Sequence, residues 1–282
     1  MKIGILGSGQ MGGGIAQTAS QAGYIVLLAD QSVEVAEKGK SKIAVQLKKL
    51  IEKAKITEAD SKKILDGITA VGTMKDLANC DVVIEAVSEN PQLKFQIFKQ
   101  LDEICAKHTI LASNTSSISI TMIAAKTQRP DQVAGLHFMN PVPVMKLIEG
   151  IRGLQTSDQT FSTLRTLAEK MGKTFIEAKD QPGFAVNRIL MPMINEAVTA
   201  LHEGIASALD IDIAMKLGTN QPMGPLELAD FIGLDTCLSI MEVLHEGLGD
   251  SKYRASPLLK QYVAAGWLGR KTGRGFFKYE TK

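Results

Sequence analysis

The chain has 282 residues, of which 45% are hydrophobic and 22% are charged, and its formal net charge is +2 at pH 7. This length suits one large domain or two ordinary ones, and the composition is typical of a soluble globular protein. The small net charge excludes any electrostatic reason to expect a nucleic-acid partner. No apolar run reaches the roughly 20 residues of a membrane-spanning helix, so we expect no membrane partner.

Cysteine and histidine usage points to a cytoplasmic protein without a metal site. Cys80, Cys105 and Cys237 are isolated thiols, and the four histidines are scattered along the chain. Neither set has the spacing of metal ligands or of a disulfide framework. The first apolar run has the pattern of a strand rather than that of a signal peptide.

The first predicted element is an apolar strand at residues 2–7, which runs into Gly7-Ser8-Gly9-Gln10-Met11-Gly12 and then into a helical pattern. In such a turn Gly7 permits the tight bend, Gly9 lets the backbone approach a pyrophosphate, and Gly12 lets the helix pack close to the strand. Gln10 and Met11 fall at the helix N-terminus, whose unpaired N–H groups bind phosphates. The context of strand, glycines and helix predicts a dinucleotide site at the N-terminus.

Asp30 closes the next apolar run, residues 24–29, at the distance expected for an acid that binds the adenosine ribose. A carboxylate there favours NAD over NADP, because it would repel a 2′-phosphate. NADP remains the alternative, since a nearby Arg or Lys or a loop movement can override this preference.

Apolar strands and helical segments alternate over the first two thirds of the chain, which predicts a doubly wound, mostly parallel sheet of the Rossmann type. The predicted strands are 2–7, 24–29, 68–71, 82–86, 109–112, 133–137, 144–149 and 174–177. Strand-like runs disappear after Pro182, where helical periodicity takes over. We therefore expect an α/β dinucleotide-binding domain at 1–182 and an all-α domain at 183–282.

Four helices are predicted in the second domain. The first covers residues 187–203, Asp212 is the expected N-cap of a second that ends at Gly218, and Asp235 is expected to cap a third that ends near 247–249. Ser256 and Pro257 supply an N-cap and N1 pair for the last helix. The glycine-rich and aromatic end, 269–279, is expected to pack on the domain.

A lysine-rich helical excursion interrupts the first domain at about residues 40–63, with eight lysines against three acidic residues. Its apolar positions give it one amphipathic face. The lysines are either a solvated basic surface or a landing site for a phosphorylated substrate.

His137 and Glu149 close two successive predicted strands, 133–137 and 144–149. Ligands of open α/β sheets bind at the carboxyl ends of the strands, where an imidazole is well placed for acid–base chemistry. A carboxylate beside it can orient the ring and stabilise its cation. A hydrogen-bonded structural histidine is the alternative.

Two further polar groups have less specific patterns. Residues 113–117 (Ser-Asn-Thr-Ser-Ser) follow a predicted strand and could form a helix cap or line the cleft. Asn187 opens the helical domain, where its amide could bind a carbonyl oxygen or serve the helix end. No nucleophile elbow is present, which argues against acyl-enzyme chemistry.

With these motifs in view, the chain resembles the L-3-hydroxyacyl-CoA dehydrogenase family over nearly its whole length. The segments that carry the resemblance are 113–117, 137–149 (His-Phe-Met-Asn-Pro-Val-Pro-Val-Met-Lys-Leu-Ile-Glu), 182–188 (Pro-Gly-Phe-Ala-Val-Asn-Arg), 214–218, 222–225 and 269–276. The amino-acid sequence of these segments is most similar to that of bacterial members that act on 3-hydroxybutyryl-CoA.

The resemblance implies reversible, NAD-dependent oxidation of (S)-3-hydroxybutyryl-CoA to acetoacetyl-CoA, running mainly as reduction in a fermenting cell. It implies that His137 is the acid–base, that Glu149 pairs with it, and that Ser116 and Asn187 contact substrate. It also implies that Glu89, Lys94 and Asn140 lie near the nicotinamide half of the cofactor, that the lysine excursion, Lys53 foremost, faces coenzyme A, and that the helical domain forms a homodimer. The alternatives are a longer or carboxylated acyl-CoA substrate, or a non-catalytic protein on the same scaffold.

Overall fold

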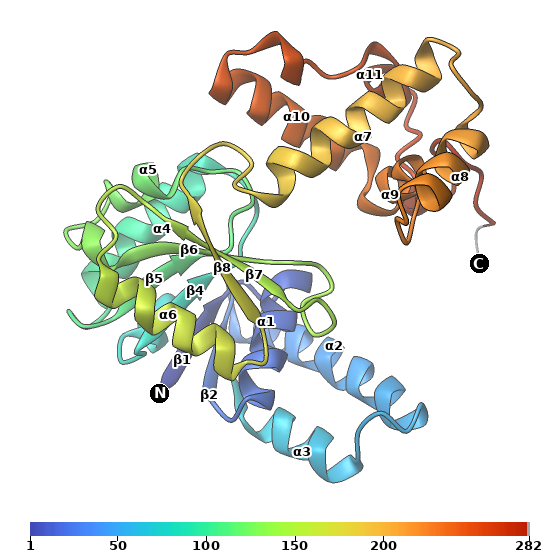
Figure 1. Ribbon diagram of the computed structural model, residues 1–282. Helices are drawn as coiled ribbons and strands as arrows, with labels where there is room; N and C mark the ends of the chain where they lie inside the picture. The colour runs from blue at the N-terminus through green and yellow to red at the C-terminus, as the bar shows by residue number, and fades with distance from the viewer. Residues whose placement is uncertain (281–282) are drawn as a thin grey trace. The chain divides into compact units, whose positions relative to one another are not determined.

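A computed structural model describes residues 1–280 of the chain. By its internal contacts the chain separates into two compact units, Met1–Gln181 and a second that begins at Pro182 (Figure 1). Each unit is described by itself below.

The first unit is built on one eight-stranded sheet with the order β3-β2-β1-β4-β5-β6-β7-β8. Its strands are β1 (Lys2–Leu6), β2 (Ile25–Ala29), β3 (Ile68–Val71), β4 (Val82–Glu85), β5 (Ile110–Ser113), β6 (Val133–Phe138), β7 (Leu147–Arg152) and β8 (Thr174–Lys179). Every neighbouring pair is parallel except β6 and β7. The predicted doubly wound, mostly parallel sheet is confirmed.

Helices connect the strands and cover the sheet (Figure 1). They are α1 (Gln10–Gln21), α2 (Val33–Glu52), α3 (Glu58–Asp66), α4 (Pro91–Ile104), α5 (Ile120–Ala124) and α6 (Asp158–Lys170), with short 3₁₀ turns η1 (Met74–Leu77) and η2 (Pro130–Gln132). All residues of β4 and β6 are buried. Since alternate side chains of a strand point to opposite faces, both faces of the sheet are covered there.

The predicted strand at 144–149 is wrong in its bounds, because β7 begins three residues later, at Leu147. The backbone N–H groups of Val144 and Met145 both donate to the Pro141 carbonyl, which forms a turn where the strand was expected. Glu149 therefore lies inside β7 and does not end it. Because β7 runs antiparallel to β6, Glu149 still faces His137 across the ladder.

The second unit consists of α7 (Val186–His202), α8 (Ala208–Gly218), α9 (Pro225–Ile232), α10 (Leu234–Leu248) and α11 (Pro257–Ala264), with 3₁₀ turns η3 (Ser251–Tyr253) and η4 (Arg270–Thr272). Its own core includes Met191, Leu226 and Leu244. None of its described residues forms a strand longer than an isolated bridge.

The predicted role of Asp212 is wrong. Ser207 caps α8, and Asp212 lies inside that helix, where it is buried and accepts hydrogen bonds from the backbone N–H groups of Leu226 and Glu227. Asp212 thus caps α9, whose first N–H groups have no partner within their own helix. Burial raises the pKa of the Asp212 carboxyl despite these bonds.

The end of the described chain packs on α9 as expected. Asp230 is buried and accepts hydrogen bonds from the backbone of Phe276 and Phe277 and from the Tyr279 hydroxyl. Gly275 passes so close to Asp230 that a Cβ there would lie 1.9 Å from its Oδ1. A side chain at this glycine would displace the C-terminal segment 275–279 from Asp230.

Candidate active site

The glycine turn after β1 has the geometry that a dinucleotide site requires. Gly7 has a φ of 102°, and a Cβ on Gly12 would lie 1.8 Å from the Gly7 carbonyl oxygen. Gly9 is exposed, and a Cβ there would have no atom within 4 Å. The helix α1 starts at Gln10 with no side-chain cap, so its N-terminus can receive an anion.

Asp30 follows β2 and is fixed beside this turn. Its Oδ2 accepts hydrogen bonds from the backbone N–H of Ser8 at 2.6 Å and from its hydroxyl at 2.7 Å. Burial alone would raise the pKa of the Asp30 carboxyl, but the bonds from Ser8 and Gln31 outweigh it and the pKa is lowered. The group is therefore an anion suited to accept bonds from a ribose hydroxyl. These features fit a dinucleotide.

His137 and Glu149 form a buried pair across the antiparallel ladder of β6 and β7. The Nδ1 of His137 lies 2.7 Å from Oε2 of Glu149, which is wholly buried. This contact fixes the ring orientation. The pair can therefore take up and release a proton at the other ring nitrogen, Nε2.

The polar segment after β5 wraps around the carboxylate of Glu89. Glu89 Oε1 accepts bonds from the Thr115 hydroxyl at 2.5 Å, from the Ser116 N–H at 2.8 Å and from the Ser117 hydroxyl at 3.0 Å. Partial burial would raise the pKa of Glu89, but Lys94 and these donors lower it. Glu89 is thus an anion that sets the position of Ser116.

Lys94 connects this segment to the interior of the sheet. Its buried Nζ lies 2.6 Å from Oε1 of Glu85 and 3.4 Å from Oε2 of Glu89. Glu85, at the end of β4, is wholly buried and also accepts bonds from the Val87 N–H and the Ser113 hydroxyl. One lysine therefore links two carboxylates at the carboxyl end of β4, and one of them, Glu89, holds the segment after β5.

Two more contacts join segments that follow different strands. Asn114 accepts a hydrogen bond from the Phe138 N–H through Oδ1, which ties the segment after β5 to the residue after His137. Gln10 donates from Nε2 to Oδ1 of Asn140 at 2.9 Å. The glycine turn, the Ser116 segment and the histidine strand consequently belong to one hydrogen-bonded edge of the first unit.

The remaining predicted residues belong to other elements. Asn187 is buried in the first turn of α7, in the second unit. Lys53 caps the C-terminus of α2 and is exposed, and the lysine-rich excursion comprises most of α2 together with α3. Seven of its eight lysines are exposed (42, 48, 49, 53, 55, 62, 63).

The roles of Glu85 and Asn114 were not predicted from the sequence. A detectable signal for Glu85 was an acid that ends an otherwise apolar strand, the same pattern that drew attention to Asp30. Asn114 was quoted only within its polar cluster, and no local pattern marks it as a partner of the Phe138 backbone.

Metal clusters and membrane-spanning helices are absent from residues 1–280. No group of three or more His, Cys, Asp or Glu residues there could hold a metal ion, and no helix there has both the length and the apolarity to cross a membrane. All three cysteines are buried thiols, and burial raises the pKa of Cys80 to about 12 and that of Cys105 to about 11.

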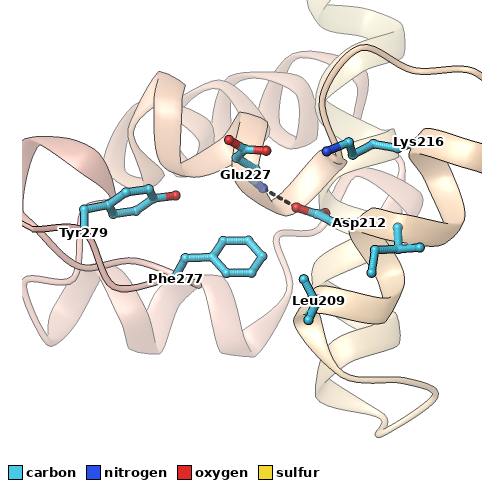
Figure 2. A pocket seen from close by; sticks show the side chains of 7 residues that line it. Leu209, Asp212, Lys216, Glu227, Phe277 and Tyr279 are labelled. Carbon is cyan, nitrogen blue, oxygen red and sulfur yellow. Dashed lines mark hydrogen bonds between the residues drawn. The ribbon is translucent and has the colours of Figure 1, made fainter.

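A cavity of about 210 Å³ lies within the second unit between α8, α9 and the C-terminal segment (Figure 2). Its walls are mostly apolar, and the bond from the Glu227 N–H to Asp212 closes one side. The lining residues are Leu209, Asp212, Ile213, Lys216, Glu227, Phe277 and Tyr279. None of them belongs to the predicted site.

Comparison with known proteins decides the family. Residues 2–181 match the model described as the NAD binding domain of 3-hydroxyacyl-CoA dehydrogenase, and residues 183–279 match its C-terminal domain. The chain belongs to the 3-hydroxyacyl-CoA dehydrogenase family. Its first unit is accordingly an NAD-binding domain.

Individual members of the 3-hydroxyacyl-CoA dehydrogenase family are similar over their full lengths. A probable 3-hydroxybutyryl-CoA dehydrogenase of Bacillus subtilis is 58% identical, covering 100% of this chain and 98% of the relative. The human mitochondrial hydroxyacyl-coenzyme A dehydrogenase is 44% identical, over 98% of this chain and 90% of that one. The crystal structure of (S)-3-hydroxybutyryl-CoA dehydrogenase from Ralstonia eutropha, 52% identical, superposes with a TM-score of 0.96 over 99% of both chains.

The two glycines of the NAD-binding turn are expected to respond differently to substitution. Gly12→Ala should lower the free energy of unfolding by about 1–3 kcal/mol, because the new Cβ collides with backbone. Gly9→Ala should leave stability nearly unchanged and weaken NADH binding, because the methyl group would stand where a turn of this kind is expected to receive the pyrophosphate. Urea denaturation and NADH titration measure both effects; a Gly12→Ala protein of normal stability would contradict the close packing of the turn.

Proposed function

We propose that this protein catalyses the reversible, NAD-dependent oxidation of (S)-3-hydroxybutyryl-CoA to acetoacetyl-CoA and works mainly in the direction of reduction. The observation that carries the proposal is the buried His137–Glu149 contact of 2.7 Å at the edge of an NAD-binding domain. The printed names of the relatives from Bacillus subtilis and Ralstonia eutropha support the four-carbon substrate.

His137 is the general acid–base in this proposal. Bound NAD supplies the acceptor for the hydride that leaves C3 of the hydroxyacyl thioester. Nε2 of His137 takes the proton from the 3-hydroxyl, and in reduction the same atom returns it to the oxygen at C3. Glu149 orients the ring through Nδ1 and stabilises the cation formed after proton uptake.

Ser116 and Asn187 contact the substrate in this proposal. The hydroxyl of Ser116 binds the oxygen at C3, and Glu89 holds its backbone in position. The amide of Asn187 binds the carbonyl side of the substrate. Gly7, Gly9, Gln10, Met11 and Gly12 hold the pyrophosphate, Asp30 binds the adenosine ribose, and Glu89, Lys94 and Asn140 flank the nicotinamide half.

The exposed lysines of α2 and α3 receive the phosphates of coenzyme A, with Lys53 as the first candidate. Lysine is a common point-charge partner of phosphate, and eight lysines against three acids give this excursion a clear positive surplus.

The two domains have different proposed roles. Residues 1–182 bind NAD and carry the acid–base, and residues 183–282 complete the substrate site and form a homodimer. Support for a dimer comes from α8, which exposes Leu209, Ile213 and Leu217 four residues apart on one face. A row of exposed apolar side chains is typical of a protein interface. Three buried free thiols agree with a cytoplasmic location.

A substrate panel tests the proposed specificity. The four-carbon, eight-carbon and carboxylated 3-hydroxyacyl-CoA thioesters are each oxidised with saturating NAD, and kcat/KM is compared. The highest value is expected for the four-carbon compound. A higher value for the carboxylated or eight-carbon thioester would retain the chemistry but overturn the substrate, and no NAD reduction with any of them would overturn the function.

A further inference from the structure

The segment that joins β6 to β7 lies between the two groups proposed for proton transfer. This segment, residues 139–146, follows the strand of His137 and precedes that of Glu149. It also packs on α1, since a Cβ on Gly14 would lie 2.8 Å from Cβ of Val142. Asn140, near its start, accepts the hydrogen bond from Gln10 in the NAD-binding turn. A shift of this segment would therefore also displace the glycine turn and the His137–Glu149 pair.

A buried lysine from outside the segment holds its backbone. Lys173, just before β8, donates from Nζ to the Val142 carbonyl at 2.6 Å and to the Met145 carbonyl at 2.7 Å. Next to it, the Thr174 N–H donates to the Lys146 carbonyl at 2.7 Å. Only 8% of Lys173 is exposed. The lysine thus reaches two carbonyls at opposite ends of the turn that Pro141 begins.

Burying an ammonium group costs free energy unless hydrogen bonds compensate it. The cost is visible here, because burial lowers the pKa of Lys173. Among residues 1–280, the hydrogen-bond partners of Nζ are two main-chain oxygens and no carboxylate. The two hydrogen bonds of Lys173 fix the geometry of residues 142–145. An apolar side chain of the same length could fill the space but could not hold the two carbonyls.

We infer that Lys173 is a positioning residue that fixes residues 139–146 and thereby keeps Asn140 in place for NAD. The inference rests on the role proposed above for Asn140. It assigns no chemical step to Lys173, which acts only through the segment it holds.

The test measures NADH binding without any acyl-CoA, so that a wrong acyl substrate cannot affect the result. Lys173→Met is expected to weaken NADH binding about tenfold, roughly the value of one lost hydrogen bond. Hydrogen exchange of the peptide 139–146 should become faster in the same variant. Lys179→Met, which removes an exposed lysine of β8, is the matched control and should change neither value.

A double-mutant cycle separates positioning from general destabilisation. Asn140→Ala should weaken NADH binding by itself, and adding Lys173→Met should weaken it little further, because both changes remove the same contribution. Lys173→Gln, which keeps a donor, gives a second and milder variant for the same measurements. Unchanged NADH affinity and exchange in Lys173→Met or Lys173→Gln, or fully additive effects in the cycle, would overturn the inference.

Discussion

Replacing His137 with Gln is expected to lower kcat for acetoacetyl-CoA reduction by about 10²- to 10⁴-fold, the usual contribution of a general acid–base. The substitution removes the group proposed to give and take the proton, while the glycine turn and Asp30 stay intact. NADH affinity should therefore remain near that of the unchanged protein. Steady-state kinetics with saturating NADH, together with an NADH titration, measures both quantities.

The matched control for this prediction is His108→Gln. His108 is exposed and lies 3.8 Å from Asp81, on another part of the first unit. Its replacement should leave kcat unchanged. Full turnover by His137→Gln would contradict the assignment of the base, and loss of NADH binding would show that the substitution damages more than proton transfer.

Replacing Lys94 with Met is expected to lower the free energy of unfolding by about 3–5 kcal/mol, the usual cost of removing one partner of a buried ion pair. Glu85 would remain wholly buried with only the Val87 N–H and the Ser113 hydroxyl to compensate its charge. Glu89 would lose its cation as well, which should loosen the Ser116 segment. Urea denaturation followed by circular dichroism measures the loss.

Two further variants make the Lys94 prediction specific. Lys99→Met removes an exposed lysine from the same helix and should have little effect on stability. The double variant Glu85→Gln/Lys94→Met should recover part of the loss, because it no longer buries an unpaired carboxylate. A double variant that is less stable than Lys94→Met alone would contradict the proposed charge balance.

The sheet could be predicted from the sequence because its signals are local. Continuous apolar runs mark the parallel strands, and glycines or prolines mark some of their ends. The error at β7 arose because Val144 and Met145 look like strand residues, whereas their N–H groups fold back on Pro141. Apolar character alone cannot distinguish a turn from the start of a strand.

The error at Asp212 has a tertiary cause. An acid near a helix start usually caps its own helix, so Asp212 was assigned to α8. In the structure it caps α9 because that helix begins beside it. The pattern of one segment contains no information about which neighbouring helix will need an acceptor.

The candidate site shows the same division between local and long-range information. Residue type and strand order drew attention to His137, Glu149 and the segment around Ser116. Their actual contacts depend on the antiparallel pairing of β6 with β7 and on the Glu89 carboxylate, which lies 27 residues from Ser116 in sequence. The contacts of Glu85 and Lys173 could not be predicted, because the partners of a buried charge are brought to it only by the fold.

The most direct measurement is a steady-state comparison of acetoacetyl-CoA reduction with NADH and with NADPH. We expect acetoacetyl-CoA-dependent oxidation of NADH that yields (S)-3-hydroxybutyryl-CoA, with a much lower kcat/KM for NADPH because Asp30 repels its 2′-phosphate. Equal or better use of NADPH would contradict the role of Asp30. Failure to oxidise either cofactor in the presence of acetoacetyl-CoA would contradict the proposed activity itself.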